Sequence, residues 1–462
     1  MTLGSRSVSR KAPIEAGPAG PGPVVMTPMS SSFLESTAAW VTENGPEAAA
    51  SRVQALVSRH ERWRVKCLNL LAAENSISRK ARRLLDSTLA TRLTEGFPGD
   101  KQFPPVRHHA EIDEIEGIFI ALARQLVPAR FVEWRATSNT MANAMALAAV
   151  TKPGDTILVQ SMTGGGNMSY HPGAVPELLR LEVADLPPGP DMGFALDGAR
   201  AAARTCRPAA IVVGGSYFLF PLPVAELRAI ADEVGAVLIY DAAHVGLLIA
   251  TGLFQAPLAE GADILTMGTH KIMGGPVGGL LFTDRADLGA RIVNRTYPLF
   301  LQTRDQNKYA AAAHSLAELV QFGPAYARQM VANAKTLAAA VEREGFAVLG
   351  RARGYTMTHQ LMLDARGVGG GLLVEKLCQA SNILLHKAWL VGDQLGTTDR
   401  GGLRITVQEV TRQGMKEAEM EEIASLIGRA AVKREATERV AADVERFVAR
   451  FPRIEYSFDD EG

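Results

Sequence analysis

The sequence predicts an α/β protein in which a large domain with a mostly parallel sheet is followed by a smaller α+β domain. With 462 residues, the chain is too long for one ordinary core, so two packed lobes with terminal arms are expected. Between residues 106 and 290, helical patterns alternate with short β-branched runs, which is typical of βαβ units. After a helical stretch near 308–345, shorter strands mix with helices, which favours a smaller α+β lobe.

The two ends of the chain are predicted to differ in kind. Residues 1–30 are rich in Gly, Pro and Ser and poor in large apolar groups, so we expect a disordered tail. Segments 49–63 and 78–93 place apolar residues at helical spacing and predict an N-terminal helical arm. The chain is therefore divided into a tail (1–30), a helical arm (31–105), a large domain (106–310), a small domain (311–435) and a C-terminal helix with its tail (436–462).

Individual elements follow from local patterns. Short buried runs predict strands in the large domain at 155–160, 209–215, 236–241, 263–268 and 277–284, and in the small domain at 346–351, 358–365 and 402–407. Helical spacing predicts helices at 224–235, 372–381 and 417–431. Near the C-terminus, apolar residues on one face predict a surface helix docked on the small lobe, rather than a partner-binding helix: Val440, Val444, Phe447, Val448 and Phe451.

Composition excludes several classes of partner. Lys plus Arg and Asp plus Glu both total 49, so binding to a nucleic acid or to an anionic membrane is disfavoured. The three cysteines are far apart and odd in number, which favours reduced thiols over a disulfide framework. The first residues contain no apolar signal region, and no apolar run is long enough for a spanning helix. We therefore expect a cytoplasmic enzyme without a metal site.

Two segments, 236–246 and 263–282, carry the central chemical pattern. A buried strand ending in Asp241 places a carboxylate at the carboxyl end of a parallel sheet, where open α/β folds bind ligands. Such a carboxylate would keep a pyridine nitrogen protonated, and Lys271, about one βα unit later, would supply a Schiff-base amine. Taken singly, Asp241 could cap a helix, Lys271 could be solvated and His270 could be a packing histidine. Together with the glycine-rich segment 274–279, they favour a cofactor site.

A polar turn before a helix supplies a candidate phosphate site. In segment 134–159, Asn139 and Thr140 lie at the expected helix N-terminus, where free backbone N–H groups and a hydroxyl can bind a phosphate. Such a turn is common as a simple helix N-cap, and it indicates a cofactor-phosphate site only because Lys271 is expected beside it.

Over most of residues 65–430 the chain resembles serine hydroxymethyltransferase and its relatives. The matching segments are 71–100, 112–116, the phosphate turn, 240–246, 268–279 and 402–415. The resemblance implies the aspartate-aminotransferase-like fold (fold type I) of pyridoxal 5'-phosphate enzymes, and a homodimer or tetramer. It also implies residue roles: Lys271 as Schiff-base lysine, Asp241 at the pyridine nitrogen, His244 at the phenolic oxygen, Thr269 and His270 beside the lysine, Arg404 on the substrate carboxylate, and Glu95 as acid–base group.

Several positions depart from the family pattern near the substrate and cofactor. An aromatic pair that the family supplies from the neighbouring subunit corresponds to Leu93 and Phe103, and a carboxylate-binding serine is replaced by Ala73. The histidine that stacks on the cofactor ring aligns with Gly164 and a nearby catalytic histidine with Asn167, so Thr163 or Tyr170 is expected to cover the ring. Gln302 and Thr303 replace a Gly-Gly of the partner subunit that meets the cofactor phosphate, and Val277 replaces an arginine of the lysine loop. Where the family contacts folate, Gln102 replaces a tyrosine and His386 replaces an asparagine.

These departures remove groups from the folate site and enlarge the cavity over the cofactor. They favour a folate-independent enzyme that makes or breaks a bond at the β-carbon of an L-amino acid, by transaldol, retro-aldol or elimination chemistry, in secondary metabolism. Thr303 keeps a hydroxyl that can donate to the cofactor phosphate. The alternatives are a decarboxylase with or without oxidative deamination, a serine or α-methylserine hydroxymethyltransferase, and a cofactor-free structural subunit.

Overall fold

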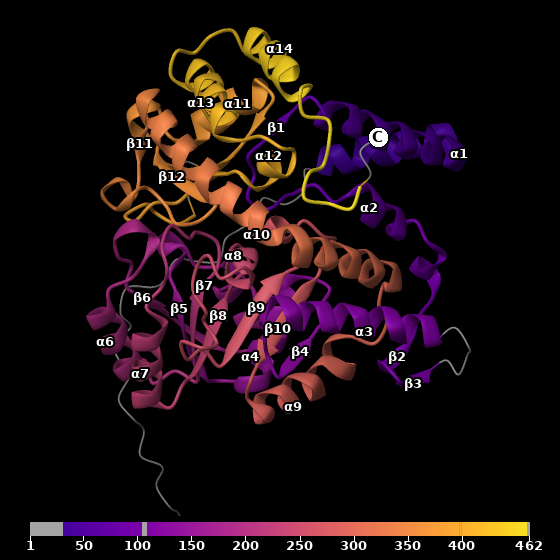
Figure 1. The fold of residues 1–462 in the computed structure, drawn as a ribbon, viewed down its shortest axis with the longest axis vertical. Coiled ribbons are helices and arrows are strands. Elements are labelled where there is room, and N and C mark those ends of the chain that lie inside the picture. The colour runs from indigo at the N-terminus through magenta and orange to yellow at the C-terminus, as the bar shows by residue number, and fades with distance from the viewer. Residues whose placement is uncertain (1–30, 104–108, 397, 399, 460–462) are drawn as a thin grey trace, which may run out of the picture.

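The large lobe is built around one sheet in the computed structural model, which describes residues 31–103, 109–396, 398 and 400–459 (Figure 1). Its strands are β4 (Phe131–Glu133), β5 (Thr156–Gln160), β6 (Glu182–Leu186), β7 (Ala210–Gly214), β8 (Val237–Asp241), β9 (Ile264–Gly268) and β10 (Gly279–Thr283). The strand order is β4-β10-β9-β8-β7-β5-β6, and β10 runs antiparallel to both of its neighbours while the others are parallel. The predicted mostly parallel sheet is confirmed.

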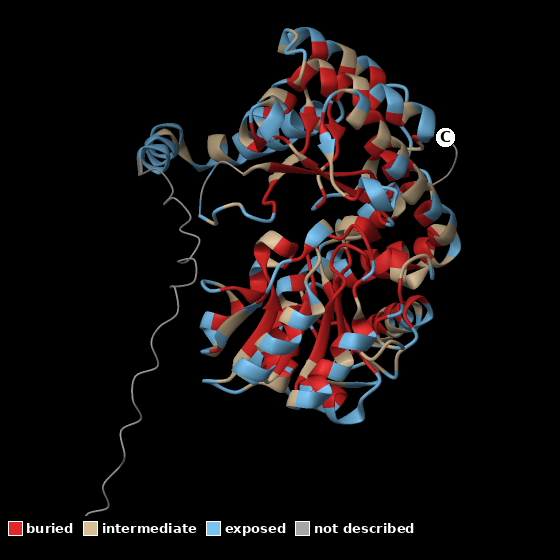
Figure 2. Ribbon diagram, turned by 90° about the vertical axis from the view of Figure 1, so that its left-hand side faces the viewer, coloured by how far each residue is buried: buried red, intermediate tan, exposed pale blue. Residues whose placement is uncertain are grey.

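Helices cover both faces of this sheet, which explains the apolar runs that predicted its strands. Along β8, Leu238 and Tyr240 pack in one core and Ile239 in the other, because successive side chains point to opposite faces. Figure 2 shows the strands as the buried centre of the lobe. The helices around them are α3 (His109–Leu126), α4 (Asn139–Val150), α6 (Leu196–Cys206), α7 (Val224–Val234), α8 (Gly246–Ala250) and α9 (Ala286–Arg295).

The small lobe holds an antiparallel sheet with the order β11-β12-β15-β14. Its strands are β11 (Ala347–Val348), β12 (Gln360–Asp364), β14 (His386–Ala388) and β15 (Gly402–Thr406), and its helices are α11 (Gly371–Ala380), α13 (Glu417–Ala431) and α14 (Thr437–Val448). The predicted strand 346–351 shrinks to β11. Four of the five predicted apolar residues are buried in α14, which packs against α11 and α13 as a docked helix, whereas Phe451 lies beyond the end of α14 and is partly buried.

One long helix, α10 (Gln306–Arg343), joins the two lobes (Figure 1). It packs against α3 of the large lobe and α13 of the small lobe. The boundary predicted between residues 310 and 311 lies inside this helix, so the lobes share a rigid element there.

The N-terminal arm contains α1 (Ser31–Arg64), which is broken at Gly45, then α2 (Arg79–Leu85) and a short 3-10 turn (Thr88–Thr91). The helix predicted over 78–93 was wrong beyond Leu85. Asp86 ends α2, and the Ser87 hydroxyl donates to the Leu84 carbonyl at 2.7 Å, which competes with continued helical hydrogen bonding. The chain then forms a hairpin of β2 (Glu95–Phe97) and β3 (Asp100–Phe103). Residues 1–30, predicted to be a disordered tail, lie outside the described part of the chain.

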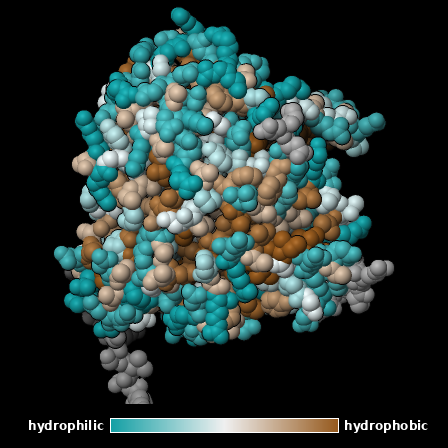
Figure 3. Space-filling view, viewed as in Figure 1, coloured by the Kyte–Doolittle hydropathy of each residue, from teal (hydrophilic) through white to brown (hydrophobic). Residues whose placement is uncertain are grey.

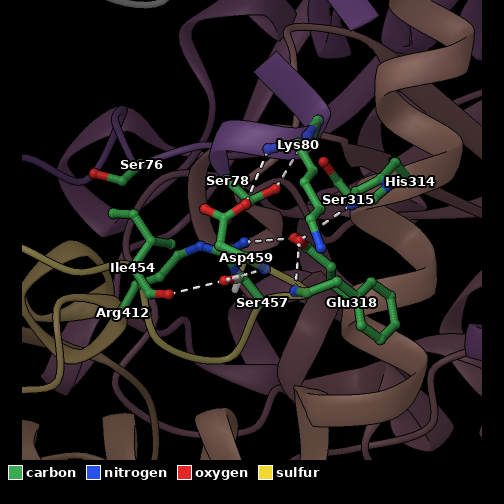
Figure 4. Close-up of polar contacts among 12 residues, drawn as sticks. Ser76, Ser78, Lys80, His314, Ser315, Glu318, Arg412, Ile454, Ser457 and Asp459 are labelled. Atoms are coloured by element: carbon green, nitrogen blue, oxygen red, sulfur yellow. Dashed lines mark hydrogen bonds and ion pairs between the residues drawn. The ribbon is translucent and has the colours of Figure 1, made fainter. Parts of the chain in front are cut away.

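The C-terminal segment crosses back over α10 and α2 (Figure 4). The Asp459 carboxylate accepts the backbone N–H groups of Arg79 at 2.7 Å and Lys80 at 2.9 Å, so it caps the first turn of α2. The Phe458 N–H donates to Glu318 of α10 at 3.1 Å. Glu318 also accepts from Arg412 at 2.8 Å, and both of these side chains are fully buried. The end of the chain therefore links α2, α10 and the small lobe.

The sequence also predicted cysteines without disulfide bonds and no membrane-spanning helix. Cys67, Cys206 and Cys378 are all unpaired thiols. Among the described helices, none is both long and apolar enough to cross a membrane.

Candidate active site

The carboxyl ends of four parallel strands meet at one edge of the large sheet. The turn after β4 leads into α4, the loop after β5 contains Asn167, β8 ends at Asp241, and the loop after β9 contains Lys271. Asp241 lies opposite Thr266 in the β8–β9 register. The loop that follows β9 therefore brings Lys271 to the same edge of the sheet as Asp241. Arg404 reaches the same region from β15 of the small lobe.

The Asp241 carboxylate is fully buried and held by side-chain amides. One oxygen accepts from Asn167 at 2.8 Å and from Asn143 at 3.0 Å, and the other accepts the Ala243 N–H at 2.8 Å. Asn139 lies at 3.4 and 3.5 Å from the two oxygens. Asn143 is itself fixed, because its oxygen accepts from Thr266 at 2.8 Å. These donors fix the orientation of the carboxylate at the edge of the sheet.

The Lys271 amine contacts His244 Nε2 at 3.2 Å. Burial and, to a smaller extent, the charge of Arg404 lower the pKa of Lys271 to about 8, against the opposing effect of Asp241. Burial, followed by the charges of Lys271 and Arg404, holds the pKa of His244 well below its usual value. The pair is therefore a weakly basic amine beside a neutral imidazole, which is what a nucleophilic lysine needs near neutral pH.

The loop that carries Lys271 is tightly fixed. Lys271 has a φ of 49°, an uncommon conformation for a non-glycine residue, and its carbonyl accepts from Asn75 at 2.7 Å. A Cβ added to Gly279 would lie 2.4 Å from the Ser138 carbonyl, and one added to Gly278 would lie 2.7 Å from the Thr269 hydroxyl. Glycine at these positions lets the lysine loop pack directly against the turn that begins α4.

That turn is a helix N-terminus with unused donors. The Ser138 side chain accepts the Met141 N–H at 3.1 Å, and Thr140 is exposed. The backbone N–H groups of Asn139 and Thr140 have no acceptor among the residues that the structure describes. Free N–H groups at the start of a 12-residue helix favour a phosphate.

Arg404 presents a buried guanidinium to this edge. Its Nη1 donates to the Ser216 carbonyl at 2.9 Å, its Nε is buried without a partner, and its charge lies 5.0 Å from the Tyr217 ring centroid. Three other buried arginines, Arg135, Arg304 and Arg412, each have a carboxylate partner. Within the described residues Arg404 has none, which leaves its charge available to an anionic ligand.

Pyridoxal 5'-phosphate meets each of these groups with matching chemistry. Its aldehyde fits the Lys271 amine, its protonated ring nitrogen fits Asp241, its phenolic oxygen fits His244, and its phosphate fits the start of α4. A seven-stranded, mostly parallel sheet followed by a smaller α+β lobe is also the architecture of the fold type I class. Fold and site thus define a pyridoxal-phosphate-dependent enzyme of fold type I.

Comparison with known proteins narrows this class to one family. The family model for serine hydroxymethyltransferase matches residues 47–427. The chain is 38% identical over 416 residues to a serine hydroxymethyltransferase of Methanopyrus kandleri, with 90% of this chain and 96% of the relative covered. It is 37% identical over 416 residues to that of Pyrococcus abyssi, with 88% and 96% covered. The chain belongs to the serine hydroxymethyltransferase family of transferases, whose enzymes use pyridoxal 5'-phosphate.

Several predicted site residues are not brought to this cluster within one chain. Glu95 lies in β2 and accepts from the Tyr297 hydroxyl at 2.8 Å, and Leu93 and Thr303 are exposed. The side chains of Gln102 and Phe103 lie outside the described part of the structure. Thr269, beside the lysine, uses its hydroxyl to donate to the Pro276 carbonyl at 2.6 Å, and His270 is partly buried, with burial lowering its pKa to about 4.

The loop after β5 holds the positions that the resemblance aligns with two histidines. A Cβ added to Gly164 would lie 2.9 Å from the Ser161 hydroxyl and 3.3 Å from the Gly193 carbonyl, so this position has little room for a side chain. Asn167, three residues later, is the residue of this loop that reaches Asp241. Tyr170 is fully buried, and burial followed by the charge of Asp241 raises its pKa.

Sequence reasoning also missed residues that the fold adds to the site. Asn143 donates to Asp241 and Asn75 donates to the lysine carbonyl, but isolated asparagines carry no spacing signal. His359 is fully buried beside Arg404, neither ring nitrogen has a partner, and burial lowers its pKa to about 3. Asn143 could have been suspected, because it lies one turn after Asn139 on the helix that begins at the phosphate turn.

Proposed function

We propose that this protein is a folate-independent enzyme that makes or breaks a bond at the β-carbon of a β-substituted L-amino acid, in secondary metabolism. The observation that carries the proposal is the buried, unpaired guanidinium of Arg404 beside the Lys271–His244 pair. A guanidinium binds a carboxylate through paired hydrogen bonds, so an amino-acid substrate fits it well.

The position of Arg404 supports chemistry at Cα–H or Cα–Cβ over decarboxylation. When bound, pyridoxal phosphate supplies a carbonyl for the substrate amine and a ring that accepts negative charge from Cα. The bond that breaks must stand perpendicular to that ring. By holding the carboxylate, Arg404 would keep the carboxyl bond out of this orientation and leave another Cα bond in it.

The other residues of the cluster have supporting tasks. Asp241, held by Asn143 and Asn167, would keep the ring nitrogen protonated and so maintain the electron sink. Neutral His244 would take or return a proton at the Lys271 amine, 3.2 Å away. Cleavage next to a β-hydroxyl also needs a base that accepts the hydroxyl proton and later returns it, and Glu95 would have this role.

Glu95 would come from a second subunit. Figure 3 shows apolar side chains gathered in a band across the face of the large lobe, over the region of α3 and α10. Exposed apolar side chains of the large lobe include Ile118 at 48%, Val277 at 52% and Leu299 at 61%. Such a surface is typical of a protein interface. Tyr297, two residues before Leu299, donates its hydroxyl to Glu95 of the hairpin at 2.8 Å.

Mixing two inactive variants tests the shared site. Lys271→Ala and Glu95→Gln homodimers should both be inactive, whereas hybrid dimers should regain activity. In a hybrid, the subunit with an intact lysine faces a partner with an intact Glu95. Failure of activity to return, with hybrid formation verified by native mass spectrometry, would place Glu95 in its own subunit's site or outside the site. A fully active monomer in sedimentation would refute the dimer.

Product analysis tests the reaction. The holoenzyme is given β-hydroxy and other β-substituted L-amino acids, with and without tetrahydrofolate, and products are identified by mass spectrometry. Retro-aldol cleavage converts a β-hydroxy amino acid into glycine and the aldehyde in equal amounts. We expect these or elimination products at the same rate with and without tetrahydrofolate. Arg404→Gln should lose them while binding cofactor normally.

Serine hydroxymethyltransferase activity is the second candidate. The names of the relatives, matched over 96% of their length, favour it. In this chain His386, one of the folate-side departures, lies 3.2 Å from Glu375, and such a paired side chain is a poor replacement for an amide facing a pterin. Turnover of serine that requires tetrahydrofolate would make this candidate the function and remove the first.

A further inference from the structure

We propose that Arg400 and Trp389 form a second anion-binding subsite next to Arg404, so that the preferred substrate carries a distal anionic group in addition to its α-carboxylate. This inference rests on the proposed function, because it assumes that Arg404 binds the α-carboxylate of an amino acid. It adds the substrate class, which is amino acids with an acidic side chain.

The two arginines lie close enough for their charges to interact. Arg404 lies in β15, which begins at Gly402, and Arg400 lies two residues before this strand, beyond a bend at Gly401. Both arginines lie near Tyr217, and the charge of Arg400 lowers the pKa of Arg404. One ligand that carries an α-carboxylate and a second anionic group can therefore reach both guanidinium groups.

The Arg400 side chain is held by stacking rather than by an ion pair with any described residue. Its guanidinium stacks on the Trp389 ring, with Cζ 3.5 Å from the ring centroid, and its Nη1 makes only a long contact of 3.5 Å to the Lys387 carbonyl. Its Nε is buried without a partner. Among the residues that the structure describes, no carboxylate lies within ion-pair distance of Arg400.

The two described carboxylates of this region are already engaged. Glu375 accepts from Lys387, and its Oε1 lies 3.2 Å from His386 Nδ1. The Asp393 carboxylate accepts the N–H groups of Leu390 and Gly401, each at 2.9 Å. Within the described part of the chain, Arg400 therefore has no carboxylate partner, as is true of Arg404.

Trp389 supplies an independent observation. Its side chain is 5% exposed, yet its indole N–H has no acceptor among the described residues. A buried donor of this kind usually has a partner, so its vacancy favours a ligand acceptor at this place. Two orphan donors, one on each of two stacked side chains, suit an anion with several oxygens such as a carboxylate or a phosphate.

The wall between the two arginines is apolar. Leu390 lies over Gly402, where an added Cβ would meet its Cδ2 at 2.7 Å, and Tyr217 packs with Leu390 in the same cluster and against Arg404. An aliphatic spacer between two anionic ends would fit such a surface.

Calorimetric binding to the holoenzyme tests the subsite. The probes are L-aspartate, L-glutamate and L-2-aminoadipate, which place the second carboxylate at increasing distance, with O-phospho-L-serine as the phosphate arm. L-Glutamine and L-norleucine are the neutral controls. We expect at least one acidic probe to bind more tightly than its neutral counterpart, and Arg400→Gln to weaken that probe on the order of 10–100-fold. Binding of the neutral amino acids should change less than twofold.

Three further variants separate specificity from structure. Arg400→Lys should retain part of the preference, and Trp389→Phe, which keeps the stacking ring but removes the N–H, should weaken the acidic probe alone. Arg204→Gln removes one charge from an exposed arginine paired with Glu233 and should change nothing. Equal losses for acidic and neutral probes in Arg400→Gln, or no acidic preference in the wild type, would overturn the subsite. If no amino acid binds at all, the proposed function fails instead.

Discussion

The buried ion pair of Glu318 and Arg412 joins the lysine loop to the C-terminal segment. Removing the negative charge of Glu318 tests whether this pair stabilises both. Both side chains are fully buried, with Arg412 donating to Glu318 at 2.8 Å. A Cβ added to Gly274 of the lysine loop would lie 3.3 Å from Arg412 Cζ. The pair therefore supports the loop that carries Lys271 as well as the fold.

Glu318→Gln keeps the shape of the side chain and leaves the Arg412 charge buried without a counter-ion. Breaking a buried pair in this way costs about 3–5 kcal/mol of unfolding free energy. The second oxygen of Glu318, which accepts the Phe458 N–H at 3.1 Å, can be replaced by the amide oxygen, so most of the loss should come from the orphaned charge. Adding Arg412→Met removes that charge and should restore most of the stability.

Urea unfolding of the three apoproteins at equal concentration, followed by tryptophan fluorescence and circular dichroism, measures the effect. We expect the midpoint order wild type, double variant, Glu318→Gln, and faster loss of cofactor from Glu318→Gln during dialysis. The reasoning is refuted if Glu318→Gln loses less than about 1 kcal/mol, or if the double variant is no more stable than the single one.

Three other predictions concern the lysine, its pH dependence and the C-terminal cap. Lys271→Ala should fold normally but lose turnover, and borohydride reduction in the presence of pyridoxal phosphate should label the wild-type peptide containing Lys271; a label on another lysine would contradict the assignment. Because burial lowers the pKa of Lys271 to about 8, the rate of cofactor loading, measured by stopped-flow absorbance, should rise about tenfold per pH unit below 8 and level off above it, whereas a rise continuing to pH 10 would show an ordinary lysine. Asp459→Ala removes two acceptors from the start of α2 and should destabilise that helix by about 1 kcal/mol, seen as faster hydrogen exchange over residues 79–85, with unchanged exchange there disproving the cap.

Local sequence patterns determined the architecture of the lobes and the central residues of the site. Apolar runs such as 236–241 and 263–268 predicted β8 and β9 nearly to the residue, because strands buried on both faces tolerate few polar side chains. The ends of parallel strands meet at one edge, so Asp241 and Lys271 could be placed together from sequence alone. Apolar spacing predicted the end of a helix less well where polar side chains compete with backbone hydrogen bonding. At Asp86 and Ser87 the predicted helix ends early for this reason.

Only the tertiary structure decided which groups lack a partner. The family resemblance singled out Arg404, but no local pattern in the sequence shows that Arg412 has Glu318 as a partner whereas Arg404 and Arg400 have no carboxylate partner among the described residues. Likewise the amides around Asp241 come from α4 and from the loop after β5, and no spacing rule connects them to β8. The reason is physical: a residue type and its local period set secondary structure, whereas burial and charge pairing depend on elements far apart in the chain. The orphaned charges that point to a ligand become visible only after the chain has folded.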